Sequence, residues 1–192
     1  ELFIWRKWAM HAVSGRLDKM CKAVKAIDDS RPVMTHVGAC SVIQDVAGDG
    51  SDDILNSSKV DFYGTSFCSE HELKNINEEC WPFMICDWLR SVSEYYWVYE
   101  LYPDWGDWNK PVKMEDYELK VLASIACGAK GLLYWQYRAE RLGNENNLSG
   151  LVNIDGSFKK VSYRSSEIKK FIERNNEFLL GANVKHDGIG IL

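Results

Sequence analysis

Long apolar runs and an excess of basic residues are both missing from this sequence of 192 residues. No stretch approaches the roughly 18 consecutive apolar residues that indicate a membrane-spanning helix. The net charge is -5, so the chain lacks the basic surplus that is typical of nucleic-acid-binding proteins. We therefore expect neither a membrane nor a nucleic acid among its partners.

Closely spaced cysteine pairs are also missing. The six cysteines form no CxxC pair and no metal-ligand spacing: Cys21, Cys40, Cys68, Cys80, Cys86 and Cys127. We predict free, mostly buried thiols and no metal site. A disulfide between Cys80 and Cys86 is the alternative that the spacing leaves open. Unpaired thiols favour a reducing, cytoplasmic compartment.

Glycine-rich phosphate-binding loops are absent as well, since no predicted strand is followed by a GxGxxG or Walker-type loop. This disfavours a nucleotide-binding function. The content of 46% hydrophobic and 27% charged residues is ordinary for a globular protein. Eight Trp and nine Tyr are a high aromatic load. Flat aromatic rings suit the apolar faces of sugars, although most such rings in any protein belong to the core.

Helical and strand patterns alternate along the chain. Apolar residues at three- and four-residue steps predict a long helix over Ile4–Ile27, packed on a core. Further helices are predicted within 48–58, around Met84–Val92, around Leu119–Ala126 and over 168–178. The predicted strands are Val33–Val37, Val60–Phe67, Tyr95–Tyr99 and Gly131–Tyr137. This alternation predicts parallel β/α units, either half of a barrel or a small doubly wound sheet.

One carboxylate stands out in this pattern. Glu100 directly follows the third predicted strand. In (β/α)8 enzymes the active groups lie at the carboxyl ends of the strands, so Glu100 is a candidate catalytic residue. The ordinary alternative is an exposed glutamate at a strand end. We interpret Glu70, which follows the second strand, as a solvated loop charge of that kind.

Four separate pieces of the chain, in order and at matching spacing, resemble the family 42 glycosidases. They are Trp97-Val98-Tyr99-Glu100, Trp108-Asn109, Ala126-Cys127-Gly128-Ala129-Lys130-Gly131 and Tyr134-Trp135-Gln136-Tyr137-Arg138. The resemblance implies an α/β fold, a (β/α)8 TIM barrel of which this chain holds about the last four β/α units. Residues 1–187 would be the C-terminal half of the catalytic domain and residues 188–192 the start of a following domain.

The resemblance also implies a chemistry. Retaining glycosidases use two carboxyl groups about 5 to 5.5 Å apart, one as nucleophile and one as general acid/base. Glu100 would be the nucleophile, and the acid/base would lie upstream of this chain. We therefore expect the 192 residues alone to be inactive, and we expect no metal or other cofactor in the reaction. The substrate would be a terminal β-glycoside, with β-galactosides favoured.

Two further positions, Trp108 and Glu145, match the family's sugar contacts. We predict Trp108 as a subsite wall, Glu145 as an acceptor for sugar hydroxyls, and Gln136 and Arg138 as supporting groups at the end of the last strand. Family resemblance also favours a homo-oligomer, specifically a trimer.

Several positions depart from the family pattern. Leu148 stands where a sugar-contacting histidine is common, and Cys68 where a tyrosine is usual near the nucleophile. None of the four histidines, His36 among them, has a catalytic partner pattern. The departures keep two alternatives open: a related retaining barrel enzyme acting on another β-glycan, and a non-catalytic carbohydrate-binding barrel.

Overall fold

The computed structural model describes residues 1–38, 50–67, 80–104, 113–143 and 149–185. Its strands are β1 (Met34–Val37), β2 (Phe62–Phe67), β3 (Tyr96–Leu101) and β4 (Gly131–Tyr134). Its helices are α1 (Leu2–Lys25), α3 (Asp53–Ser57), α5 (Trp81–Val92), α6 (Met114–Ala126), α7 (Lys160–Arg174) and α8 (Asn176–Gly181). The predicted elements are present with shifted boundaries; the larger differences are that β3 includes Glu100, β4 ends three residues before the predicted end, and the last predicted helix is two helices.

The four strands form one parallel sheet in the order β1-β2-β3-β4, which confirms the predicted β/α units. Each strand pairs with the next strand in the chain. A doubly wound sheet would instead reverse its strand order at a switch point. The sequential order therefore selects the barrel-like alternative, and all the strands place their carboxyl ends at one edge.

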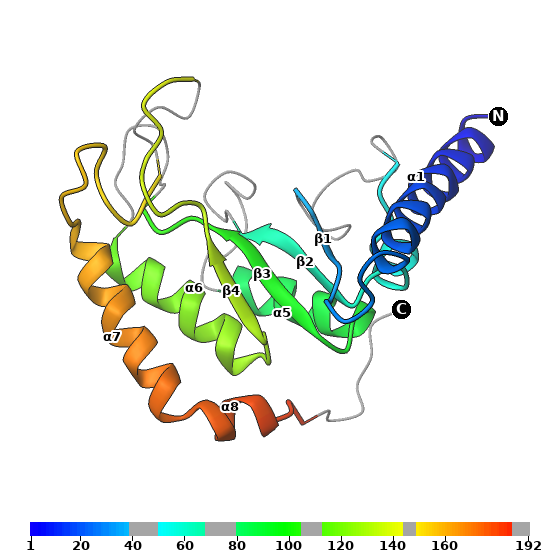
Figure 1. The fold of residues 1–192 in the computed structure, drawn as a ribbon. Coiled ribbons are helices and arrows are strands. Elements are labelled where there is room, and N and C mark those ends of the chain that lie inside the picture. Colours follow the sequence, from blue (N-terminus) through cyan, green and yellow to red (C-terminus); the bar gives the residue numbers. More distant parts are fainter. Residues whose placement is uncertain (39–49, 68–79, 105–112, 144–148, 186–192) are drawn as a thin grey trace.

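The core lies between this sheet and the helices that follow β2, β3 and β4. Figure 1 shows α5, α6 and α7 along one face of the sheet. Fully buried side chains from both layers meet there, including Val98 of β3, Leu89 of α5 and Val121 of α6. Alternate residues of β3 face this core, so Trp97 and Tyr99 point to the opposite face of the sheet. That opposite face carries the candidate site.

The long helix α1 is present as predicted, but its expected burial is wrong for this chain. Trp8 is 65% exposed and Met20 59% exposed, while the buried residues of the helix are Ser14 and Cys21. Figure 1 shows α1 at the opposite end of the sheet from α7. Periodicity identifies which residues form an apolar stripe, but it does not require a partner for that stripe within the same chain.

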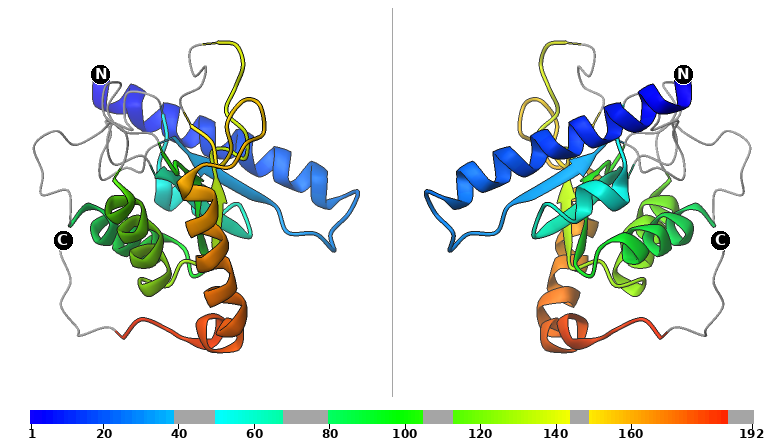
Figure 2. Two further views of the ribbon diagram at one scale, coloured as in Figure 1. Left: turned by 90° about the vertical axis from the view of Figure 1, so that its left-hand side faces the viewer. Right: turned by 90° about the vertical axis from the view of Figure 1, so that its right-hand side faces the viewer.

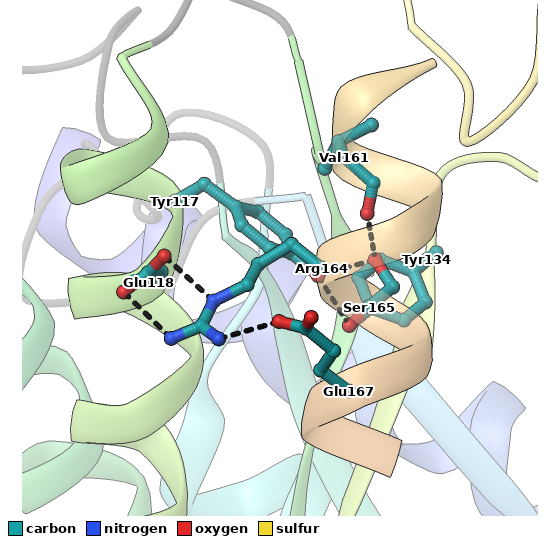
Figure 3. A network of polar contacts seen from close by, with 7 residues as sticks. All are labelled: Tyr117, Glu118, Tyr134, Val161, Arg164, Ser165 and Glu167. Atoms are coloured by element: carbon teal, nitrogen blue, oxygen red, sulfur yellow. Dashed lines mark hydrogen bonds and ion pairs between the residues drawn. The ribbon is translucent and has the colours of Figure 1, made fainter. Parts of the chain in front are cut away.

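A buried polar network joins β4, α6 and α7 (Figure 3). The hydroxyl of Tyr117 lies 2.8 Å from that of Tyr134 and 2.6 Å from Ser165 Oγ. Beside it, Arg164 donates two hydrogen bonds to Glu118, of 2.6 and 3.0 Å, and one of 2.7 Å to Glu167. These contacts fix α7 against α6 and the end of β4.

The described cysteines are free, as predicted: Cys21, Cys80, Cys86 and Cys127. Cys80 is exposed and the other three are buried, so the alternative disulfide between Cys80 and Cys86 is wrong. A hydrogen bond with Cys127, together with burial, holds the pKa of Cys86 well above its ordinary value. Cys40 and Cys68 lie outside the described residues.

Candidate active site

Glu100 is an extra residue in β3. Tyr99 and Leu101 pair with Ser66 and Phe67, which are consecutive residues of β2, so Glu100 has no partner opposite it. The register with β4 shifts over the same segment. This is a β-bulge, a feature that often lies beside active sites and redirects a side chain. The regular alternation of the strand therefore does not determine where Glu100 points.

The backbone of Glu100 confirms this local distortion. Its φ is +52°, the left-handed region, and no other described non-glycine residue has a positive φ. Such a conformation costs on the order of 1–3 kcal/mol and persists where the surrounding structure enforces it. As a result Glu100 lies on the same side of the sheet as Tyr99, because His36 contacts both residues.

Two donors from neighbouring strands hold the carboxylate. Ser66 of β2 donates to Glu100 Oε2 at 2.5 Å, and His36 Nε2 of β1 lies 3.3 Å from Oε1. The hydroxyl of Tyr102 adds a longer contact of 3.4 Å to Oε2. Glu100 keeps 24% of its side chain exposed. The arrangement is an oriented carboxylate that remains accessible at the carboxyl edge of the sheet.

A row of aromatic rings continues from the carboxylate along the same face. His36 and Tyr99 have ring centroids 5.6 Å apart, Tyr99 and Trp97 5.8 Å, and Trp97 and Phe62 5.6 Å. Tyr99 is 1% exposed, and its hydroxyl has no hydrogen-bond partner within the described part of the chain. Burial raises the pKa of Tyr99 to about 12.

The other predicted site residues divide into two groups. Gln136 and Arg138 follow β4, in a segment that rises beyond the end of the strand (Figure 2). The main chain of Gln136 accepts a hydrogen bond from Leu151, and Arg138 is exposed, with no ion pair to any residue in the described ranges. Trp108 and Glu145 lie outside the described residues, as do Cys68 and Leu148.

The sequence interpretation missed Ser66 and His36. His36 has no catalytic partner pattern in the sequence. Its position next to Glu100 results from β1 and β3 both flanking β2, which the predicted parallel order could have indicated. The contact to Ser66 depends on the bulge, and no periodic pattern signals that feature.

A separate cavity of about 510 Å³ lies between β4, α7 and α8. Its lining is mostly apolar, with Leu132, Ile168 and Ile172 among its residues, and Glu100 does not contribute to it. Among the residues that the structure describes, no group of three or more His, Cys, Asp or Glu could hold a metal ion, and no helix is long and apolar enough to cross a membrane.

Comparison with known proteins decides the family. A family model described as β-galactosidase, of glycoside hydrolase family 42, matches residues 1–176. The chain belongs to glycoside hydrolase family 42. The family 42 chain also shares its fold with solved enzymes. It matches the β-galactosidase from Rahnella sp. R3 with a TM-score of 0.76 and 17% identity, over 94% of this chain and 27% of that one.

A second structure carries a catalytic mutation. A family 42 β-galactosidase from G. stearothermophilus, solved as a catalytic mutant with a glutamate replaced by alanine, matches with a TM-score of 0.77 and 16% identity. The match covers 94% of this chain and 27% of that one. At such identities the likeness shows the fold alone, a TIM barrel in these relatives, and this chain spans about a quarter of their length.

One protein outside this family also shows sequence similarity to the chain. A flavodoxin from Buchnera aphidicola is 30% identical over 124 residues, 62% of this chain and 67% of the flavodoxin. Flavodoxin-like sheets have the strand order 2-1-3-4-5. The observed order β1-β2-β3-β4 differs from it, so this similarity does not extend to the fold.

Proposed function

We propose that this chain provides the nucleophile of a retaining β-glycosidase, with β-galactosides as substrates and Glu100 as the attacking carboxylate. The observation that carries the proposal is the bulge at the end of β3, which presents Glu100 at the carboxyl edge of a parallel sheet with both carboxylate oxygens oriented. The strand end is where barrel enzymes place their active groups. The family 42 relatives with this fold are β-galactosidases, which supports galactosides as the sugar class.

The reaction needs a second carboxyl group. A retaining mechanism requires a general acid/base about 5 to 5.5 Å from the nucleophile. Two carboxyl groups among the described residues are engaged in structural contacts: Asp104 pairs with Lys159, and Asp53 accepts hydrogen bonds from Tyr63 and Trp88. We propose that the acid/base comes from a part of the polypeptide outside this chain, and that the 192 residues alone hydrolyse no glycoside.

Covalent trapping tests the proposal in the complete protein. An activated 2-deoxy-2-fluoro-β-galactoside forms a glycosyl ester with the nucleophile, and the ester turns over slowly. Digestion and mass spectrometry should locate the added mass on the peptide that contains Glu100, and Glu100→Gln should abolish the labelling. A label on another carboxylate would refute the assignment of Glu100. No label at all, together with sugar binding, would support the non-catalytic alternative.

A further inference from the structure

We infer that Ser66 and His36 are positioning residues, which fix the plane of the Glu100 carboxylate for attack. This inference rests on the proposed role of Glu100. The two donors serve different oxygens: Ser66 Oγ lies 2.5 Å from Oε2, and His36 Nε2 lies 3.3 Å from Oε1. A carboxylate held at Oε2 by a hydrogen bond and at Oε1 by the imidazole contact cannot rotate about its last torsion without losing one of the two contacts.

The donors are themselves held by the sheet. Ser66 is 6% exposed and pairs in register with Tyr99, the residue before the bulge. Its hydroxyl lies within hydrogen-bond distance of Glu100 Oε2, at 2.5 Å. A serine hydroxyl has one proton to donate, and here Glu100 receives it. Ser66 therefore acts on Glu100 from a buried and rigid position.

His36 reaches the same carboxylate across a glycine. Its register partner on β2 is Gly64, where a Cβ would meet Tyr99 Cδ2 at 2.3 Å. The missing side chain allows the rings of His36 and Tyr99 to approach over β2, with centroids 5.6 Å apart. The contact with Oε1 favours the imidazole tautomer that carries its proton on Nε2. The adjacent strands β1, β2 and β3 thus contribute His36, Ser66 and Glu100, respectively.

Orientation matters because only one oxygen attacks. Oε2 accepts hydrogen bonds from Ser66 and Tyr102, whereas the single contact with His36 leaves Oε1 a lone pair for the anomeric carbon. Effective attack requires close alignment of the reacting atoms, and positioning groups supply a large part of that alignment. Neither Ser66 nor His36 needs to contact the sugar in this role. Loss of either should lower kcat far more than it changes KM.

The test uses Ser66→Ala and His36→Ala in the complete protein. We expect kcat for an aryl β-galactoside to fall about 10- to 100-fold in each, because a hydrogen bond to a charged group is lost. The rate constant of inactivation by the fluoroglycoside should fall by the same factor, while its binding constant stays within about twofold. Ser66→Thr, which keeps the hydroxyl, should recover most of the activity.

A matched control lies next to Ser66. Thr65 is fully buried, points to the other face of β2 and donates to Val37 O at 3.2 Å. Thr65→Val should lower stability but leave kcat within about twofold. The inference is overturned if Ser66→Ala labels Glu100 at the wild-type rate, or if it weakens inhibitor binding instead of slowing inactivation. A label on a different carboxylate would overturn the proposed function itself, so the two failures are distinguishable.

Discussion

Gly131 of β4 lies directly against the indole of Trp97 on β3. A Cβ at Gly131 would come within 2.1 Å of Trp97 Cδ2, far inside contact distance. The two residues are register partners, so the glycine provides the space in which the indole lies flat on the sheet. Trp97 in turn contacts Tyr99, the residue that precedes Glu100. The packing of the aromatic rings next to Glu100 therefore depends on Gly131.

Gly131→Ala should destabilise the protein by about 1–3 kcal/mol, because the added methyl group must displace the indole or the strand. Urea denaturation with tryptophan fluorescence measures both effects. The control is Gly15→Ala, in the middle of α1 with no atom within 4 Å of the added Cβ. That variant should gain up to about 1 kcal/mol from helix propensity. Equal stability of wild type and Gly131→Ala would contradict the packing described here.

Tyr117→Phe should lower the free energy of unfolding by about 1–3 kcal/mol. Tyr117 is fully buried, and the change leaves the hydroxyls of Tyr134 and Ser165 without their shared partner (Figure 3). Tyr163 provides the control, because it lies on α7 with 64% of its surface exposed. Tyr163→Phe should leave stability unchanged. Equal effects of the two substitutions would show that the Tyr117 network does not stabilise the fold.

Replacing Glu100 by glycine and by alanine should separate backbone strain from side-chain contacts. Both variants lose the hydrogen bonds of the carboxylate, but only alanine must still occupy a φ of +52°. Glu100→Gly should therefore be more stable than Glu100→Ala by about 1–2 kcal/mol. At Glu167, in the middle of α7, the order should be reversed by about 1 kcal/mol. If alanine were more stable than glycine at both positions, that result would argue against the left-handed conformation of Glu100.

The alternating β/α units and the strand-end position of Glu100 could be predicted from periodicity, whereas the sequential strand order follows only from the family resemblance, because periodicity leaves a doubly wound sheet open. Four apolar segments alternate with helices, and the carboxylate follows the third one. The bulge could not be predicted, because one extra residue in a strand leaves the apolar pattern of Trp97, Val98 and Tyr99 unchanged. The exposed apolar stripe of α1 shows a different limit of sequence analysis. Its periodic pattern predicts the helix correctly, but no surface that covers the stripe lies among the described residues.

Alkaline pH should destabilise the protein partly through Tyr99. Burial raises the pKa of Tyr99 from its ordinary 10.0 to about 12, so the folded state favours the protonated hydroxyl. The resulting stabilisation is fully present below pH 10 and is lost as the pH rises through 12. Between pH 10 and 12 the unfolding free energy should fall by about 2 kcal/mol less in Tyr99→Phe than in the wild-type protein.

Neutral pH provides the complementary test of this residue. The Tyr99 hydroxyl has no hydrogen-bond partner in the described ranges, so Tyr99→Phe should not lower stability at pH 7. Denaturation curves at pH 7, 10 and 12 measure both effects. A large loss at pH 7 would reveal a partner for the hydroxyl outside these residues.

The central claim is that Glu100 attacks the anomeric carbon, and azide rescue of Glu100→Ala tests it most directly. In the complete protein this variant should lose several orders of magnitude in turnover of an aryl β-galactoside while remaining folded. Azide fits the space left by the carboxylate and can attack the same face of the sugar. We expect restored turnover and a product with α configuration, opposite to that of the substrate, identified by NMR. Normal activity of the variant, or a β-glycosyl azide, would place the nucleophile elsewhere.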